Sequence, residues 1–272
     1  KERVAAELNR LEGQGDMVFF YDDNFCASPR RTKELLNHLL DEEVFLPPWI
    51  AQVSVRAARD EEMLELMARS GCHTVFIGFE SIDERALELH EKRQVVDDIR
   101  RAIRRFHRHG IGVHGMFVFG SDVEDVQTIR KTAQFVIDED IESVQFLTLT
   151  PLPGTPIYEE MEKAGRLLTT EWSKYDTHNA VFRPAKMTAS ELMEETMNAM
   201  AKVYSLKRTA RFLGRGKLQR AGVPFYAGRQ VRRVRRENRN YIKLLKVREA
   251  VEKPRAGVLP RLERALAGVV AG

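Results

Sequence analysis

Residues 49–81 read WIAQVSVRAARDEEMLELMARSGCHTVFIGFES and contain two short apolar segments, 49–55 and 73–79. The segment between them has the periodicity of an amphipathic helix, with one apolar face formed by Met63, Leu64, Leu66 and Met67. Asp60 is suited to cap the start of this helix, and Gly71 is suited to end it. The stretch therefore predicts a βαβ unit, in which a helix joins two parallel strands.

The same alternation continues on both sides of this unit. Further apolar runs of strand length occupy 17–21, 112–119 and 142–150, and helical periods occupy 97–109 and 124–139. Because these runs are nearly continuous in apolar character, we expect parallel strands that are covered on both faces. The sequence predicts an α/β fold whose parallel sheet is either open or curled into a barrel.

In parallel α/β sheets, ligands bind at the carboxyl ends of the strands, in the loops that lead into the helices. This rule selects the polar residues and glycines that follow the predicted strands. They are Asp22, Asp23, Asn24, Ser54, Arg56, Glu80, Ser81, Gly120, Ser121, Asp122 and residues 148–155, TLTPLPGT. We expect a functional site on the rim that these residues form.

Two aspartates and an asparagine end the first predicted strand, at Asp22, Asp23 and Asn24. Such a group can bind a cation, accept a proton or hold a ligand amine. Alternatively, one of them only caps the next helix, which we expect to begin after Ser28 and Pro29. Residue spacing alone does not choose between these two interpretations.

Glu80 and Ser81 end the strand at 73–79. A carboxylate at this position can accept hydrogen bonds from a ribose diol or an ammonium group. The alternative is that Ser81 caps a helix and Glu80 pairs with a basic neighbour. The turn at 150–155, TPLPGT, is stiffened by two prolines and presents its backbone amides and carbonyls in a fixed array. That array suits the edge of a flat base, and a plain connector is the alternative.

Only two cysteines are present, Cys26 and Cys72, which are too few for a disulfide framework and are not spaced for a metal site. We predict that both are structural, that the compartment is reducing and that the protein is cytoplasmic. No apolar run approaches the roughly 18 residues of a membrane span, and the N-terminus lacks the apolar core of a signal peptide. Motifs of serine hydrolases, phosphate-binding loops and zinc sites are also absent.

The net charge of +4 conceals an asymmetry along the chain. Residues 207–236 hold 11 Lys and Arg residues and no Asp or Glu, so the rest of the chain has 33 basic against 40 acidic residues. We expect a capped helix over 188–213 and a basic region that is helical beyond Gly228. This region could bind nucleic acid, bind anionic lipid, or simply pack on the acidic body.

Four stretches resemble a known family in their order and spacing: residues 49–81, FFYDDNF at 19–25, GIGVHGMFVFG at 110–120 and LTLTPLPGTPIYEEMEKAGRL at 147–167. The family is the radical S-adenosylmethionine (radical SAM) superfamily, and in particular its branch with an N-terminal cobalamin-binding domain, which includes hopanoid-type methylases. The resemblance implies a partial (β/α)6 TIM-like barrel. The first strand of that barrel would lie upstream of Lys1.

The resemblance also implies three parts: a partial barrel with strands two to six over 1–165, a barrel-closing segment with a long helix over 166–205, and a basic, mostly helical extension over 206–272. Members of the family hold a 4Fe-4S cluster with three cysteines in a CxxxCxxC loop after the first strand. No such loop exists in this sequence, which also begins without methionine. We therefore expect a fragment that is inactive alone and whose cluster cysteines and cobalamin domain lie upstream.

Matching positions then imply contacts with S-adenosylmethionine (SAM). The residues expected to bind it are Asp22, Asp23, Asn24, Ser54, Glu80, Ser81, Gly120, Thr150, Leu152, Pro153 and Gly154. Asp22, Asp23 and Asn24 would contact the methionine amino end of SAM. Glu80 and Ser81 would lie near its ribose and methionyl parts. The turn at 150–155 would pack along the adenine. The resemblance assigns no metal ligand and no catalytic residue within the chain.

The implied activity is reductive cleavage of SAM to a 5′-deoxyadenosyl radical that functionalises an unactivated carbon, with cobalamin-dependent methyl transfer as the first interpretation. One alternative is a radical enzyme without cobalamin that performs oxidation, cyclisation or rearrangement. Another is a binding module without a cluster that uses its basic tail for nucleic acid or anionic lipid. The implied partners are a small-molecule or lipid-like substrate, an electron donor such as flavodoxin or ferredoxin, and an anionic surface contacted weakly through residues 207–236.

Overall fold

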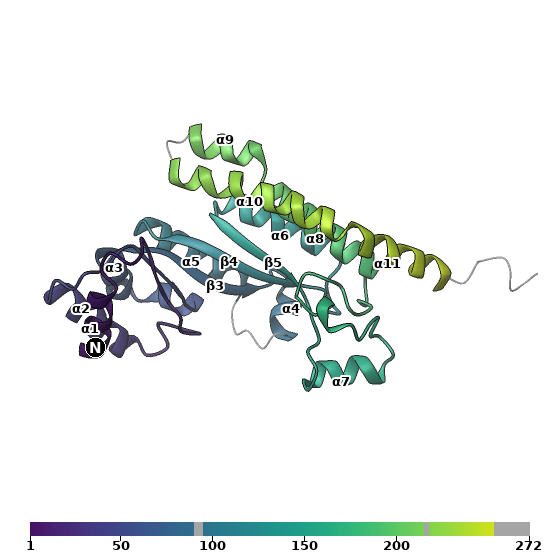
Figure 1. Ribbon diagram of the computed structural model, residues 1–272, viewed down its shortest axis with the longest axis horizontal. Coiled ribbons are helices and arrows are strands. Elements are labelled where there is room, and N and C mark those ends of the chain that lie inside the picture. The colour runs from purple at the N-terminus through teal and green to yellow at the C-terminus, as the bar shows by residue number, and fades with distance from the viewer. Residues whose placement is uncertain (90–94, 215–217, 253–272) are drawn as a thin grey trace, which may run out of the picture.

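The protein, in a computed structural model that describes residues 1–89, 95–214 and 218–252, is built around one parallel five-stranded sheet. The strands lie side by side in chain order, from β1 at one edge to β5 at the other. Figure 1 shows β3, β4 and β5 next to one another. They are β1 (Val18–Phe20), β2 (Trp49–Gln52), β3 (Cys72–Glu80), β4 (Gly112–Phe119) and β5 (Ser143–Thr148). Parallel neighbours joined through helices confirm the predicted α/β fold of a partial, TIM-like barrel.

Helices connect the strands and continue after the last one. They are α1 (Glu2–Arg10), α2 (Pro29–Asp41), α3 (Glu61–Arg69), α4 (Glu84–Leu89), α5 (Val96–Arg108), α6 (Val126–Asp138), α7 (Pro156–Lys163), α8 (Ala189–Val203), α9 (Leu206–Gly214), α10 (Leu218–Glu237) and α11 (Arg239–Glu252), with short 3₁₀ helices η1 (Val55–Arg59) and η2 (Trp172–Lys174). Local chemistry explains several helix starts. The Asp60 side chain accepts a hydrogen bond from the Met63 N–H at 3.1 Å, and Thr188 and Glu191 form a capping box at the start of α8.

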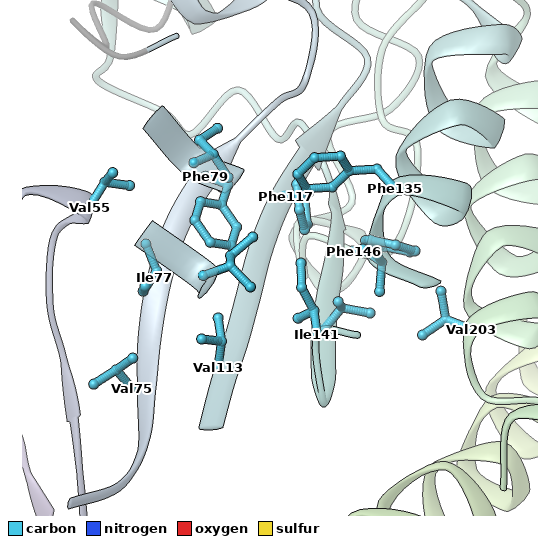
Figure 2. Close-up of a cluster of buried hydrophobic side chains, with 14 of the residues drawn as sticks. Val55, Val75, Ile77, Phe79, Val113, Phe117, Phe135, Ile141, Phe146 and Val203 are labelled. Atoms are coloured by element: carbon cyan, nitrogen blue, oxygen red, sulfur yellow. The ribbon is translucent and has the colours of Figure 1, made fainter. Parts of the chain in front are cut away.

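The two faces of the sheet differ sharply. On one face, large side chains of the strands are fully buried beneath the helices, as Figure 2 shows for Phe79, Phe117 and Phe146. On the other face, Phe76 and His114 are only half-buried. The expectation that both faces are covered was therefore wrong. Five strands do not close a barrel, so the inner face of the sheet stays open among the described residues.

The predicted single helix over 188–213 was also wrong, because the chain turns between α8 and α9. Two side chains at this turn bind the backbone next to and within β5. The Tyr204 hydroxyl donates to the Val144 carbonyl and accepts from the Val144 N–H, both at 2.7 Å, and the Arg208 guanidinium donates to the Ile141 carbonyl. These contacts cover backbone groups at the edge of the sheet that would otherwise be unpaired.

We expect Tyr204→Phe to lower the free energy of unfolding by about 2–4 kcal/mol, because it leaves a buried N–H and a buried carbonyl of Val144 without a partner. Urea denaturation measures this loss, and the slope of the unfolding free energy against urea concentration should be unchanged. Tyr226→Phe is the matched control, since Tyr226 is 67% exposed and should change stability by less than about 0.5 kcal/mol. Equal small losses in both variants would contradict the role given to Tyr204.

The basic C-terminal helices pack on the body of the protein. Figure 1 shows α10 and α11 running along α8, on the same side of the sheet as α6. Glu249 accepts hydrogen bonds from the Ser190 backbone N–H and hydroxyl at 2.8 and 2.6 Å, and Arg183 pairs with Glu252 at 2.6 Å. Residues 253–272 of the predicted extension lie outside the described residues.

Helix α10 begins at Leu218, earlier than the predicted start beyond Gly228, and it continues through Pro224. Gly228 lies where α10 meets the end of α8, and a Cβ at this position would stand 2.6 Å from the Tyr204 carbonyl oxygen. Only glycine allows the two helices to approach this closely. None of the described helices combines the length and the apolar character that a membrane span requires.

Candidate active site

A cavity of about 960 Å³ opens at the carboxyl ends of the strands, a volume within the range of small-molecule sites. It brings together five residues that the strand-end rule selects for the site: Asp23, Asn24, Ser54, Arg56 and Glu80. Gln52, Gly78, Met116, Val118 and Leu147 also line it. Carboxylates, the amides of Asn24 and Gln52 and the guanidinium groups of Arg56 and Arg59 therefore surround an apolar floor formed by strands β4 and β5.

The loop after β1 supplies an unpaired acceptor. Its backbone is anchored, because the Phe25 N–H donates to the Gln52 carbonyl at 2.9 Å and the Thr32 hydroxyl donates to the Phe25 carbonyl at 2.8 Å. The Oδ1 atom of Asn24 is buried and has no hydrogen-bond partner among the described residues. A buried acceptor of this kind is costly unless a ligand or water donates to it.

The helix-capping interpretation of this loop is not supported. Ser28 occupies the N-cap position of α2, and no side chain caps that helix. Asp22 is exposed and does not line the cavity, whereas its neighbour Asp23 does. Of Asp22, Asp23 and Asn24, the structure thus brings Asp23 and Asn24 to the cavity.

Glu80 reaches the cavity from an unusual backbone conformation. Its φ angle is +64°, in the left-handed region that residues other than glycine seldom occupy. The pairing of β3 with β4 shifts register between Gly78 and Glu80, and the Ser81 N–H donates to the Phe79 carbonyl at 2.8 Å across the strained residue. Strain of this kind concentrates at functional sites, where the surrounding structure maintains it.

Ser81 does not reach the cavity, because its hydroxyl donates to the buried Glu124 carboxylate at 2.7 Å. The other oxygen of Glu124 accepts hydrogen bonds from the backbone N–H groups of Gly120 and Ser121 at 3.1 and 3.2 Å. Burial raises the pKa of Glu124 above its ordinary value. This carboxylate joins the loop after β3 to the loop after β4 and so holds the chain next to Glu80. Sequence reasoning did not select Glu124, which lies beyond the strand end.

The remaining predicted contacts lie away from the cavity lining. Gly120 has φ +109°, and a Cβ there would be 2.9 Å from the Leu192 side chain, so its small size is required by packing on α8. In the turn at 150–155, the Thr150 hydroxyl donates to the Thr148 carbonyl at 3.1 Å, and Thr155 caps α7. The exposed residues of the turn are Leu152, Pro153 and Gly154. Contact of Gly120 and of this turn with a cofactor stays a prediction.

Arg56 is the cation of the cavity without a partner. The other lining cation, Arg59, pairs with Asp98 at 3.2 Å, and the lining carboxylate of Asp60 pairs with Lys33 at 2.8 Å. Arg56 is exposed at the start of η1 and forms no ion pair among the described residues. The strand-end rule selected this residue, but the resemblance assigned it no role. Its guanidinium is suited to bind a carboxylate of a ligand.

The residues present do not fit an iron–sulfur cluster. The chain has two cysteines, and both thiols are buried. Burial raises the pKa of Cys26 to about 12 and raises that of Cys72 as well, so both stay protonated near neutral pH, whereas cluster ligands are thiolates. Over the described ranges, no three Cys, His, Asp or Glu side chains are grouped to hold a metal ion.

Comparison with known proteins identifies the class. The sequence matches the Radical SAM superfamily over residues 1–136, which is half of the chain. This chain therefore belongs to the radical SAM superfamily, as the strand-end motifs indicate. The observed α/β partial barrel is the fold that the resemblance to this superfamily implied.

Several relatives are methyltransferases. The chain is 31% identical over 204 residues to bacteriochlorophyllide d C-12(1)-methyltransferase of Chlorobaculum tepidum, covering 75% of this chain and 44% of that protein. It is 28% identical over 173 residues to hopanoid C-2 methylase of Rhodopseudomonas palustris, covering 61% and 33%. The fold resembles the radical SAM methyltransferase TsrM from Kitasatospora setae, solved with cobalamin and a 4Fe-4S cluster bound, with TM-score 0.53 and 22% identity over 62% of this chain and 33% of that one. The chain spans less than half the length of these proteins.

Proposed function

We propose that the cavity at the carboxyl ends of β2, β3 and β4 binds SAM, and that the chain is the SAM-binding part of a radical SAM methyltransferase. The observation that carries this proposal is the meeting of Asn24, Arg56 and Glu80 around one cavity of about 960 Å³. Membership of the superfamily and similarity to two methyltransferases support it.

Each part of SAM has a chemical counterpart in the cavity. The ammonium group would donate to Asp23 and to the unpaired Oδ1 of Asn24. The carboxylate would pair with Arg56, and the ribose hydroxyls would donate to Glu80. The adenine would lie on the apolar floor, which is formed by Met116, Val118 and Leu147. These residues would bind and orient SAM and exclude water from it.

Transfer of a methyl group to carbon is proposed as the activity of the whole protein, to which this chain contributes the SAM site. Bound SAM supplies the sulfonium whose reductive cleavage yields the radical of this superfamily. The cluster that delivers the electron, and cobalamin as a methyl carrier, would be held by residues outside this chain. That these residues lie upstream stays a prediction.

The partners also belong to the proposal at this level. Of the predicted partners, a small-molecule substrate is the partner that agrees with membership of the superfamily. The electron donor and the contact with an anionic surface stay predictions. Exposed cations on α10 support the contact with an anionic surface: Arg229, Arg232, Arg233, Arg235 and Arg236. One predicted member of that surface, Arg208, is instead buried against β5.

Calorimetric titration of the protein with SAM tests the site directly. We expect saturable binding, and we expect Arg56→Ala to weaken it about 5- to 20-fold because a charge-assisted contact with the carboxylate is lost. The same variant should bind 5′-methylthioadenosine unchanged, since this probe has no amino-acid part. Arg69→Ala removes an exposed cation that does not line the cavity and is the control. Absence of SAM binding, or an equal loss in Arg69→Ala, would contradict the proposal.

A further inference from the structure

We infer that the junction of α10 and α11 binds the phosphate groups of an anionic phospholipid surface, and that the outer side of α11 enters the edge of that surface. The site is separate from the SAM cavity, because it is built on helices outside the parallel sheet. The surface concerned, here the basic junction, has two parts. One is a cavity lined by Arg235, Arg236, Arg239, Lys243 and Lys246. The other is a row of exposed apolar side chains on α11, namely Leu244, Val247 and Val251.

The cavity of the basic junction has a volume of about 410 Å³ and lies where α10 and α11 meet the side of α8. Its one lining carboxylate, Glu194, is already paired with Lys246 at 2.6 Å. Arg236, Arg239 and Lys243 line it as well and form no ion pair among the described residues. A hollow with several uncompensated cations attracts anions, and a phosphate group can accept charge-assisted hydrogen bonds from more than one of them.

Nearby carboxylates do not offset this positive charge. Residues 229–246 contain eight Lys and Arg residues and one acidic residue, Glu237, which pairs with Arg233 at 2.9 Å. Farther along α11, Glu252 pairs with Arg183 at 2.6 Å and with Arg248 at 2.8 Å. The predicted basic segment 207–236 contains only two of the five cavity cations, so the structure extends the anion-binding surface onto α11.

Helix α11 has apolar side chains on two sides. On the inner side, Ile242 and Leu245 are buried where the helix packs on α8. On the outer side, Leu244 and Val247 are each 61% exposed and Val251 is 80% exposed. Their spacing of three and four residues places these three on one side of the helix. A surface helix ordinarily carries polar residues on its outer side, so this row is available to a partner.

The two parts of the basic junction together favour a lipid surface over other phosphate-bearing partners. Lys243 lies four residues before Val247, so its ammonium can reach a phosphate while the valine contacts the apolar edge of the bilayer. Nucleic acid or a soluble phosphate compound would use the cations and leave the apolar row in water. The exposed aromatic residues of α10, Phe225 and Tyr226, lie in its first half and do not line the cavity, so stacked bases have no platform there.

Sedimentation of the full chain with phospholipid vesicles tests the cations. We expect binding to vesicles made of equal parts of phosphatidylglycerol and phosphatidylcholine, and little binding to pure phosphatidylcholine. Arg236→Gln, Arg239→Gln and Lys243→Gln should each weaken the binding about fivefold, the share of one cation near an anionic surface. Arg69→Gln removes an exposed cation of α3 and should have no effect.

The same assay tests the apolar row. Leu244→Ser and Val247→Ser should each weaken vesicle binding about five- to tenfold, because each removes apolar area that the lipid would cover. Both side chains are exposed to water in the free protein, so the urea midpoint should stay unchanged. Leu11→Ser, which changes a side chain 43% exposed beside α1, is the control. Figure 1 shows α1 and α11 at opposite ends of the molecule.

Three results would overturn the inference. The first is equal binding to the two kinds of vesicle, or equal losses in the control variants. The second is tighter binding to single-stranded DNA that is weakened by Arg239→Gln and not by Leu244→Ser, which would favour nucleic acid. The third is binding of inorganic pyrophosphate that depends on Arg239 without any binding to vesicles, which would favour a soluble phosphate compound. SAM affinity should be unchanged in all these variants, so any of the three results leaves the proposed function standing.

Discussion

Replacing Glu80 by glutamine is expected to weaken SAM binding by about ten- to a hundredfold, the cost of losing hydrogen bonds to a charged group. Glu80 lines the cavity from a left-handed backbone conformation with φ +64°, which indicates that the surrounding fold holds the backbone of this residue in place. Calorimetry with SAM and with 5′-methylthioadenosine measures the loss. Both ligands carry the ribose that Glu80 would bind, so both should bind more weakly.

Three comparisons make this result specific. Glu65→Gln changes an exposed carboxylate of α3 and should leave both affinities unchanged. Glu80→Gly should lose binding while keeping its stability, because glycine adopts a positive φ without strain and this gain offsets the lost contacts of the carboxylate. Arg56→Ala should weaken only the ligand that has a carboxylate. Unchanged affinity for both ligands in Glu80→Gln would remove Glu80 from the site.

Glu124→Ala is expected to lower the free energy of unfolding by about 3–5 kcal/mol, a large part of the stability of a typical domain. The fully buried carboxylate accepts hydrogen bonds from the Ser81 hydroxyl and from the N–H groups of Gly120 and Ser121, and alanine would leave all three donors without this partner. Urea denaturation measures the loss. A loss below about 1 kcal/mol would mean that these donors find other partners.

Glutamine at position 124 should be tolerated far better than alanine. Its amide oxygen can accept the two N–H groups, and its amide nitrogen can donate to the Ser81 hydroxyl, which is also an acceptor. The exposed Glu65→Ala serves as a control for removing a carboxylate. If Glu124→Gln were as unstable as Glu124→Ala, the hydrogen-bond assignment of this network would be wrong.

The pH dependence of stability gives an independent measure of Glu124. Burial raises the pKa of this carboxyl group above its ordinary value of 4.5, so the folded protein binds the proton more tightly than the unfolded chain does. The stabilisation from this group is therefore complete below pH 4.5 and is lost as the pH rises through the raised pKa. Glu124→Gln should lack this decline. Parallel stability curves for the two proteins would contradict it.

Local patterns in the sequence were sufficient for the strands and for helices α3, α5 and α6. Strand-length apolar runs, helical periods and capping residues such as Asp60 act over a few neighbouring residues, and these elements accordingly begin and end close to the predicted positions. The rule for parallel sheets then placed polar strand ends on one rim. Five of the residues that it selects, Asp23, Asn24, Ser54, Arg56 and Glu80, line one cavity, because carboxyl ends of parallel strands share an edge.

Contacts between distant residues determined the rest. Ser81 and Glu80 are neighbours in sequence, yet Ser81 donates its hydroxyl to Glu124, 43 residues later, while Glu80 lines the cavity. The resemblance places Gly120 among the SAM contacts, and the group that packs against Gly120 in the structure is the side chain of Leu192.

The turn after α8 shows the same limit, since no local signal ends a helix at Val203 and the bonds of Tyr204 to β5 do. The alternation of a strand tells which residues share a face, and it cannot tell which face the rest of the chain will cover. Here helices α3, α5 and α6 bury Phe79, Phe117 and their neighbours, and Phe76 and His114 stay open. Period and capping are local properties of the chain, whereas burial depends on elements that fold onto each other from far apart.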